Sequence, residues 1–143
     1  MVRTMISMLR GRHLLAATLL AAPAAAAVPD YAAFIIPDGA SDRVISVEHF
    51  ACMADRGYIE AGSHECVEAE LARLQPRLDA AAAAAGRGLA EAQAEWVATR
   101  WVRCDAEAAL ESETMAPLVR DGCRLDETVR RLLWLESLAP ARS

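Results

Sequence analysis

Cysteine and histidine are the residues of this chain whose spacing could support chemistry. Two pairs lie close together, in the patterns His49-x-x-Cys52 and His64-x-Cys66. Two histidines and two cysteines are a set of ligands that zinc accepts. The same cysteines also belong to an even set of four, completed by Cys104 and Cys123, which is typical of two disulfide bonds in an exported protein. The alternatives are therefore a zinc site and a disulfide framework, and the disulfide framework is favoured if the chain is exported.

No motif of a catalytic centre accompanies these residues. The chain has no HExxH helix, no glycine-rich phosphate loop and no Ser-His-Asp order. It has 20 acidic residues, but nothing in their spacing singles out a pair for acid–base hydrolysis. We therefore expect a protein that is not an enzyme and that needs no cofactor.

Residues 1–27 have the three parts of a secretory signal peptide. A start with three arginines (Arg3, Arg10 and Arg12) is followed by the apolar run LLAATLLAA and then by small residues. The apolar run is shorter than the ~20 residues that a membrane span needs. No cysteine near the cleavage region could accept a lipid. We expect a periplasmic or secreted protein that begins near Val28 and has no membrane anchor after signal removal.

The charge of the chain changes when this segment is removed. All 15 basic residues are arginines, and three of them lie within the first 27 residues, whereas all 20 acidic residues follow. The remaining net charge is 12 − 20 = −8. A negative charge of this size argues against nucleic acid or an anionic membrane as a partner. It favours either a cationic protein partner or a role in solubility alone.

The four cysteines allow three disulfide pairings. We expect Cys52–Cys66 and Cys104–Cys123, because each of these bonds closes a short loop between consecutive elements. Each bond should stabilise the fold by roughly 3 kcal/mol by restricting the unfolded chain. Only 143 − 27 = 116 residues follow the predicted signal, and a domain of this size buries little apolar surface.

The stretch from Leu89 to Cys104 is predicted to be the central helix of the fold. At about 100° per residue, one face carries Leu89, Gln93, Trp96, Arg100 and Cys104. The apolar surface continues over Ala90, Ala94, Val97 and Trp101. An apolar arc this wide indicates burial by more than one neighbouring helix. We expect both tryptophans to lie in the core.

Two arginines have different expected surroundings. A buried guanidinium without a partner is costly, so we expect an ion pair between Arg100 and either Glu65 or Glu68. Arg87 lies between two glycines at the tip of a predicted loop, where its side chain is not expected to contact the core. Arg87 is therefore either a solvated turn residue or a contact for a partner.

A long helix is predicted on each side of this central stretch. The first begins at an N-cap Ser63, is kinked by Pro76 and ends before Gly86. Its apolar stripe consists of Val67, Leu71, Leu74 and Leu78. The other has Pro117 in its first turn, after the polar link from Glu111 to Thr114. It is expected to direct Leu125, Val129, Leu132 and Leu133 into the core, with Trp134 at the flank.

Residues 28–45 are predicted to form an extended N-terminal arm, because they contain two prolines and the turn signal Pro-Asp-Gly. The arm should pack its apolar residues Phe34, Ile35 and Ile36 against the bundle. Ser46 is then expected to cap a short helix that ends at Gly57.

These motifs resemble the LprI-like lysozyme-inhibitor family of small exported helical proteins. The resemblance rests on the order Cys52, Cys66, Ala92-Gln93-x-x-Trp96-x-x-x-Arg100-x-x-x-Cys104, Cys123 and Thr128-x-x-Arg131. It covers about Cys52 to Leu138. The chain departs from the family in two places, with Leu74-Gln75-Pro76-Arg77-Leu78 in place of Leu-Asn-x-x-Tyr and Glu111-Ser112-Glu113-Thr114 in place of a glycine-containing loop.

The sequence thus predicts an all-α, disulfide-stapled bundle of three to four helices, with its arm at 28–45 and its domain at 46–143. The resemblance implies that the protein binds a lysozyme and blocks it without chemistry of its own. The alternatives are a periplasmic interaction module without inhibitory activity and, less favoured, a His/Cys zinc-binding protein. The residues assigned to the structural motif are Gln93, Trp96, Arg100, Thr128 and Arg131. One candidate for partner binding is Arg87, which suits the carboxylates of a lysozyme cleft. The other candidates are Glu111 and Glu113, which are expected to contact the rim of that cleft.

Overall fold

The structure is a computed structural model that describes residues 30–57 and 60–138. Its elements are α1 (Ala40–Val44), α2 (Val47–Asp55), α3 (Glu60–Ala85), the 3-10 turn η1 (Arg87–Leu89), α4 (Ala90–Thr99), α5 (Val102–Ala108) and α6 (Ala116–Leu138). No strand occurs in these residues, so the predicted all-α class is confirmed. The predicted signal peptide lies outside the described residues.

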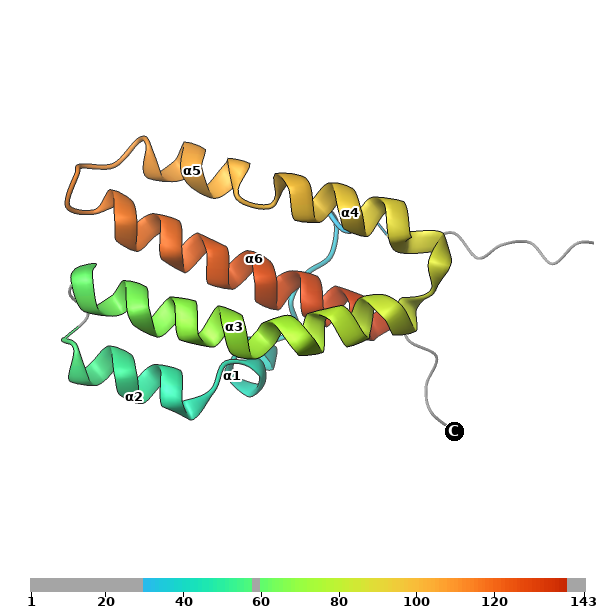
Figure 1. The fold of residues 1–143 in the computed structure, drawn as a ribbon, viewed down its shortest axis with the longest axis horizontal. Coiled ribbons are helices and arrows are strands. Elements are labelled where there is room, and N and C mark those ends of the chain that lie inside the picture. The colour runs from blue at the N-terminus through green and yellow to red at the C-terminus, as the bar shows by residue number, and fades with distance from the viewer. Residues whose placement is uncertain (1–29, 58–59, 139–143) are drawn as a thin grey trace, which may run out of the picture.

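The helices form four rows that lie side by side, in the order α2, α3, α6 and α4–α5 (Figure 1). The chain runs along α3, returns through α4 and α5, and enters α6 in the same direction as α3. The contact between α3 and α6 is the most extensive in the fold, while α2 packs on α3 and α5 packs on α6. The centre of the bundle therefore lies between α3 and α6.

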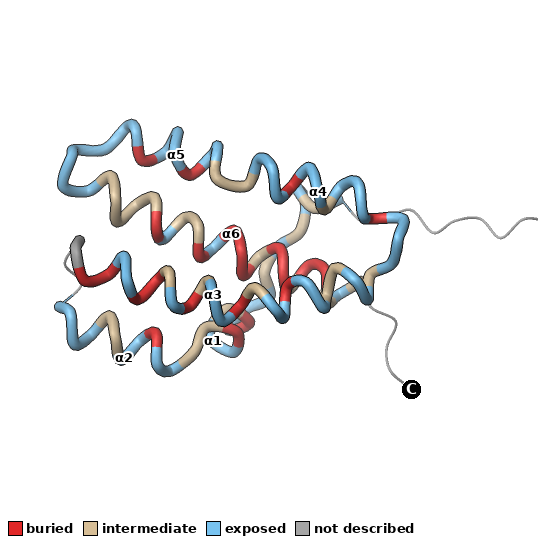
Figure 2. Tube along the Cα trace, viewed as in Figure 1, coloured by how far each residue is buried: buried red, intermediate tan, exposed pale blue. Residues whose placement is uncertain are grey.

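Long aliphatic side chains from α3 and α6 fill this centre. Figure 2 shows the buried positions of both helices on the sides that face the bundle. The predicted stripe of α3 is confirmed, since Leu74 and Leu78 are fully buried and Val67 is nearly so. On α6, Val129 and Leu132 are buried as predicted. The prediction of a flanking Trp134 was wrong, because its side chain is only 2% exposed and belongs to the core.

The predicted central helix is neither central nor continuous. It is divided between α4 and α5 at Arg100 and Trp101, and it forms an outer row (Figure 1). Its alanines offer little apolar area, so the leucines of α3 and α6 gain more from burial and occupy the centre. Val97 remains 46% exposed as a result. Near the break, the Thr99 hydroxyl donates to the carbonyl of Glu95 over 2.9 Å, a bond of the kind that bends helices.

The first helices confirm one predicted cap and correct another. The Ser46 hydroxyl accepts from the backbone amide of His49 over 3.1 Å and begins α2. Ser63 is not an N-cap, because α3 already begins at Glu60 and Ser63 is buried within it. The start of α3 approaches α2 so closely that a side chain at Gly62 would meet Arg56.

Pro76 does not interrupt α3, which continues to Ala85. The turn beyond that helix needs Gly86, whose φ of 96° favours glycine. The predicted start of the last helix is confirmed, since Pro117 lies in the first turn of α6.

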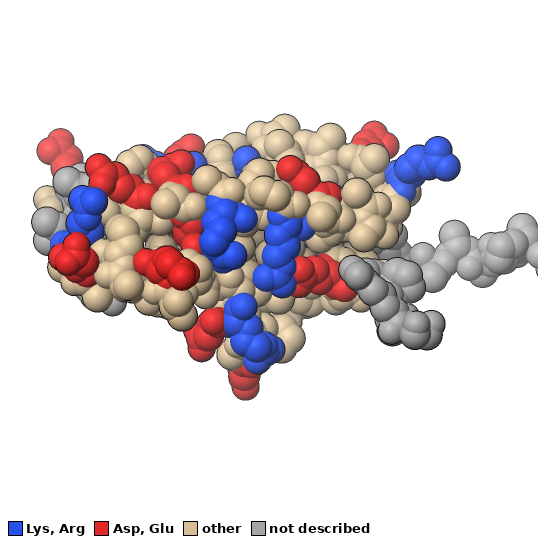
Figure 3. Space-filling view, turned by 60° about the horizontal axis from the view of Figure 1, so that its bottom comes forward, with Lys and Arg blue, Asp and Glu red and all other residues tan. Residues whose placement is uncertain are grey.

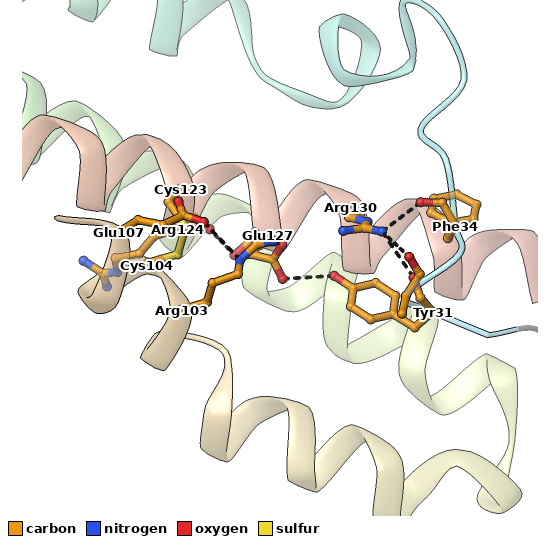
Figure 4. Close-up of polar contacts among 11 residues, drawn as sticks. Tyr31, Phe34, Arg103, Cys104, Glu107, Cys123, Arg124, Glu127 and Arg130 are labelled. Atoms are coloured by element: carbon orange, nitrogen blue, oxygen red, sulfur yellow. Dashed lines mark hydrogen bonds and ion pairs between the residues drawn. A yellow bond between two sulfur atoms is a disulfide. The ribbon is translucent and has the colours of Figure 1, made fainter. Parts of the chain in front are cut away.

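The N-terminal arm crosses α6, as Figure 4 shows. The guanidinium of Arg130 donates to the carbonyls of Tyr31, Ala32 and Phe34 over 3.4, 3.1 and 3.0 Å. Phe34 and Ile36 are partly buried, whereas Ile35 is 85% exposed, contrary to its predicted packing. The arm then forms α1, a short helix that the sequence analysis did not predict.

Both predicted disulfides are present, Cys52–Cys66 and Cys104–Cys123, with Cα atoms 5.8 and 5.4 Å apart. They join α2 to α3 and α5 to α6, so each outer row is linked covalently to the central pair. No cysteine is free. The predicted alternative of a His/Cys zinc site is therefore contradicted, because zinc binding would require thiolates.

Candidate functional site

The helical motif of the sequence surrounds a buried arginine. The guanidinium of Arg131 lies 4.4, 4.9 and 5.3 Å from the ring centroids of Trp134, Tyr31 and Trp96. Its Nε donates to the Gln93 side-chain oxygen over 2.9 Å. Its burial lowers the pKa of this guanidinium, and no carboxylate lies within ion-pair distance in the described residues. Aromatic rings and neutral oxygens therefore stabilise the charge.

Thr128 and Arg100 have contacts of different kinds. The buried Thr128 hydroxyl donates to the carbonyl of Arg124 within α6 over 2.9 Å. Arg100 does not form the expected ion pair, because Glu68 pairs with Arg124 at 2.5 Å and Glu65 pairs with Arg56 at 2.9 Å. The α4–α5 break instead places the Arg100 guanidinium 4.3 Å from the ring centroid of Trp101. These contacts support an internal role for Thr128 and leave Arg100 without a carboxylate in the described part of the chain.

Arg87 occupies the turn at one end of the bundle, between α3 and α4 (Figure 1). Its side chain is exposed and makes no ion pair among residues 30–57 and 60–138. Leu89, which is buried, fixes the turn to the bundle from the other side. Arg87 is therefore an exposed cation without an ion pair in the described part of the chain, in a turn that the buried Leu89 holds against the bundle.

A shallow apolar groove adjoins the Arg87 turn. It has a volume of about 640 Å³. Its lining comes from the end of α3 and from α4, and includes Ala82, Ala83, Arg87, Ala90, Ala94 and Val97. Alanine side chains leave such a surface open because they fill little space. The turn and its groove, which we call the Arg87 face, can present one guanidinium beside an apolar surface to another protein.

The other two candidates for partner binding lie far from the Arg87 face. Glu111 and Glu113 are exposed on the link between α5 and α6, at the opposite end of the bundle (Figure 1). The bundle between these two ends is spanned by α3, whose 26 residues correspond to about 39 Å of helix. The structure therefore does not bring Arg87 and these glutamates into one compact contact. The exposed carboxylate nearest in the chain to Arg87 is Glu91 on α4, followed at equal separation by Asp79 and Glu95, and none of the three was predicted to bind a partner.

The surface carries both signs of charge. In Figure 3, basic and acidic side chains alternate along the face that is shown. Some of this alternation comes from ion pairs between rows, such as Arg77 with Glu136 at 2.7 Å and Arg120 with Asp105 at 2.9 Å. Arginines in such pairs are less available to a partner than Arg87 is.

One group of side chains has the composition of a metal site. One ligand atom each of His64, Glu68 and Asp121 lies within 4.8 Å of the others. However, the Arg124 guanidinium is 2.5 Å from Glu68 and 3.6 Å from Asp121. His64 also contacts Asp121 over 2.9 Å. A guanidinium so close to both carboxylates opposes a metal cation, so the group is better described as an ion-pair network.

The comparisons with known proteins identify the family of the chain. A family model described as lysozyme inhibitor LprI matches residues 52–135, which is more than half of the chain. Neither the comparison with curated proteins nor that with solved structures found a match. The matched range contains all four cysteines, both tryptophans of α4–α5 and the Arg87 turn. No described helix has the length and apolar character needed to cross a membrane. Because the family model covers more than half of its residues, the chain belongs to the LprI family of lysozyme inhibitors.

Proposed function

We propose that this protein binds a lysozyme and blocks its cleft with the Arg87 face. The observation that carries the proposal is the position of Arg87, an exposed arginine without an ion pair in the described residues, within the range that matches an inhibitor family. Lysozymes hydrolyse peptidoglycan with two carboxylates in a cleft. A guanidinium matches a carboxylate with two parallel hydrogen bonds. Arg87 is thus suited to occupy such a cleft.

The inhibition would be by steric and electrostatic contact alone. The Arg87 turn contains no nucleophile, and its neighbours on the groove are mostly alanine. The alanine groove would pack against an apolar part of the cleft wall, while Leu89 holds the turn in place. We therefore propose stoichiometric inhibition without turnover.

We also propose that residues 1–27 direct export and are removed. Two disulfides fit an oxidising compartment, and lysozymes act on the cell wall outside the cytoplasm. After removal, the net charge of 12 − 20 = −8 would attract a cationic lysozyme from a distance. The proposed charge attraction and the proposed Arg87 contact are separable, because the first depends on the whole chain and the second on one residue.

The test is inhibition of peptidoglycan lysis by several lysozyme types at physiological salt, with the oxidised protein from Val28 onward. We expect inhibition at stoichiometric concentration, and an unrelated acidic helical protein serves as the control for charge alone. Inhibition no better than that control would contradict the proposed function and leave an interaction module without inhibitory activity.

The contribution of Arg87 is tested with Arg87→Gln. We expect this variant to bind about tenfold or more weakly, because a charged hydrogen bond is lost. The matched control is Arg43→Gln, since Arg43 is also exposed and makes no ion pair in the described residues, but lies on α1. If both variants inhibit like the wild type, the inhibitory surface lies elsewhere. If both lose activity equally, general charge and not the Arg87 face determines binding.

A further inference from the structure

Two arginines share one tryptophan on the side of the bundle formed by α3, α6 and the α4–α5 break. The ring centroid of Trp101 lies 4.3 Å from the Arg100 guanidinium carbon and 4.8 Å from that of Arg124. A cavity of about 220 Å³ opens beside them. We call it the Trp101 pocket, and the lining residues that matter are Glu68, Gln75, Arg100, Trp101, Arg124 and Thr128.

The two arginines of the Trp101 pocket differ in their ion-pair partners. Arg124 is compensated, because its guanidinium lies 2.5 Å from Glu68 and 3.6 Å from Asp121. Arg100 has no carboxylate within ion-pair distance in the described residues. Burial, together with the nearby charge of Arg124, lowers the pKa of the Arg100 guanidinium, and the charge of Asp79 only partly opposes this. Of the two arginines, Arg100 is therefore the one without a direct ion pair in the described residues, and the charge of Asp79 reaches it only from beyond ion-pair distance.

Hydrogen-bonding capacity is also unused there. The Nε atoms of Arg100 and Arg124 are both buried, and neither has a hydrogen-bond partner among the described residues. An unsatisfied buried donor is unfavourable, and more so when the group is charged. A ligand that accepts hydrogen bonds and carries negative charge would give the two guanidinium groups an acceptor and Arg100 a counter-charge.

We propose that the Trp101 pocket binds a monoanionic carboxylate between Arg100 and Arg124. The planar guanidinium suits a carboxylate, which accepts two parallel hydrogen bonds. The Trp101 ring stabilises both cations by cation–π contact, at 4.3 and 4.8 Å from its centroid. Glu68, which also lines the pocket, repels a dianion more strongly than a monoanion, so a ligand with one negative charge is favoured. The carboxylate belongs either to a small free acid or to an acidic side chain of a protein partner.

This site is separate from the Arg87 face, so the two proposals can fail independently. Arg87 lies in η1 at the end of the bundle, whereas the Trp101 pocket is lined by α3, α6 and the α4–α5 break. Loss of lysozyme inhibition would leave the carboxylate site in place, and loss of carboxylate binding would leave inhibition in place.

The direct test follows the Nε–Hε signals of the arginines by NMR in the oxidised protein from Val28 onward. Acetate is titrated against chloride at constant ionic strength. We expect the Arg100 and Arg124 signals to move and to saturate at millimolar acetate, while the Arg87 signal stays constant. No movement beyond the chloride reference would overturn the proposal, as would equal movement of all arginine signals. Sulfate binding more tightly than acetate would overturn the monoanion assignment.

A second titration separates the two sources of carboxylate. N-acetyl-glutamic acid α-amide presents a single carboxylate on a protein-like side chain. Binding of this compound as well as acetate supports the site and shows that an acidic side chain of a protein partner can also occupy it. Binding of acetate alone supports the site for small free acids. Binding of neither compound overturns the proposal.

Arg100→Gln is the variant that tests the residue. We expect acetate to bind about tenfold or more weakly, because one charged donor is lost, and Arg100→Lys to recover only part of that loss because it lacks the planar fork. Arg43→Gln is the matched control and should bind acetate like the wild type. Unchanged acetate binding by Arg100→Gln would overturn the assignment. Circular dichroism and disulfide mapping check that the variant is folded, and if it is not, the wild-type titration decides.

Discussion

The Nε of Arg131 donates a hydrogen bond to the side-chain oxygen of Gln93 over 2.9 Å, although 38 residues separate the two in the chain. This bond joins α6 to α4, the outer helix that otherwise packs only lightly on the bundle. A second donor of the same guanidinium reaches the carbonyl of Ala92 over 3.4 Å. The two halves of the motif, Gln93-x-x-Trp96 and Thr128-x-x-Arg131, therefore meet at one buried cation.

Removal of the Gln93 amide should destabilise the fold. Gln93→Ala leaves Arg131 Nε buried without its acceptor, and we expect a loss of about 1–3 kcal/mol in the free energy of unfolding. Urea denaturation of the oxidised protein measures the change. The control is Gln75→Ala, because the Gln75 amide donates to Asp79 on an exposed face. Its effect should stay within about 0.5 kcal/mol. Equal losses in the two variants would contradict the special role of Gln93.

Trp96 should act through the fold as well. Its ring is 7% exposed and lies beside the Arg131 guanidinium. Trp96→Ala should lower the free energy of unfolding by roughly 3–5 kcal/mol, since a large buried ring is replaced by a cavity. Val97→Ala is the matched control, because Val97 is the next residue and is 46% exposed. A Trp96→Ala variant that melts like the wild type yet fails to bind its partner would place Trp96 in a binding surface instead.

Glu70 should make the stability depend on pH in the acid range. Burial alone would raise the pKa of this carboxyl, but hydrogen bonds from Arg73 and Ser46 outweigh burial and lower the pKa to about 2. The Ser46 amide and hydroxyl donate over 2.8 and 2.6 Å. Because the pKa is lower in the folded state, the stabilisation is complete above the ordinary value near 4.5 and is lost as pH falls towards 2.

The variant that tests this is Glu70→Gln. We expect it to be less stable than the wild type at neutral pH, with a difference that shrinks between pH values of about 4.5 and 2. Thermal melts across this range measure the difference. Glu91→Gln on the exposed side of α4 is the control. A difference between Glu70→Gln and the wild type that does not change with pH would contradict the assigned pKa.

Tyr31 should ionise only in strongly alkaline solution. Burial, followed by the charge of Glu127, raises its pKa from 10.0 to about 12. Its hydroxyl donates to Glu127 over 3.2 Å, and Glu127 also contacts Arg103 (Figure 4). The folded state resists the ionised form, so stability should fall as pH rises from about 10 towards 12.

The absorbance of tyrosinate in the ultraviolet measures this ionisation. The chain has two tyrosines, so Tyr31→Phe should remove the phase with the raised pKa, and Tyr58→Phe should leave it. A raised phase that survives Tyr31→Phe would show that the assignment to Tyr31 is wrong.

Binding to a cationic lysozyme should weaken with salt. The net charge after residue 27 is 12 − 20 = −8, and screening shortens the reach of exposed charges from about 30 Å at 0.01 M to about 8 Å at 0.15 M. We expect the association rate constant to fall across this range while the dissociation rate constant changes little. Stopped-flow or surface measurements of both constants test this. An association rate that is independent of salt would contradict electrostatic steering.

Much of the local structure follows from the sequence itself. The i, i+4 spacing of Leu74 and Leu78 is a property of one helix, and it predicts their shared buried face correctly. The Ser46 cap also depends on neighbours only three residues away. Both disulfides close loops between consecutive elements, so their pairing could be inferred from chain order. Interactions of short range in the chain need no knowledge of the rest of the fold.

The tertiary structure decided which helix lies at the centre and which charges pair. From the sequence, Trp96 is correctly expected in the core, but its helix is wrongly expected at the centre. The wide apolar arc of that helix does not reveal that the leucines of α3 and α6 bury more apolar area. The predicted ion pair of Arg100 with Glu65 or Glu68 was wrong, because Glu68 contacts Arg124 and Glu65 contacts Arg56. Ion pairs and polar contacts depend on distances between the rows of helices. The sequence does not give these distances, so it does not decide which of several carboxylates pairs with a given arginine. The arm with Tyr31, the Trp101 pocket and the separation of Arg87 from Glu111 therefore became visible only in the packed bundle.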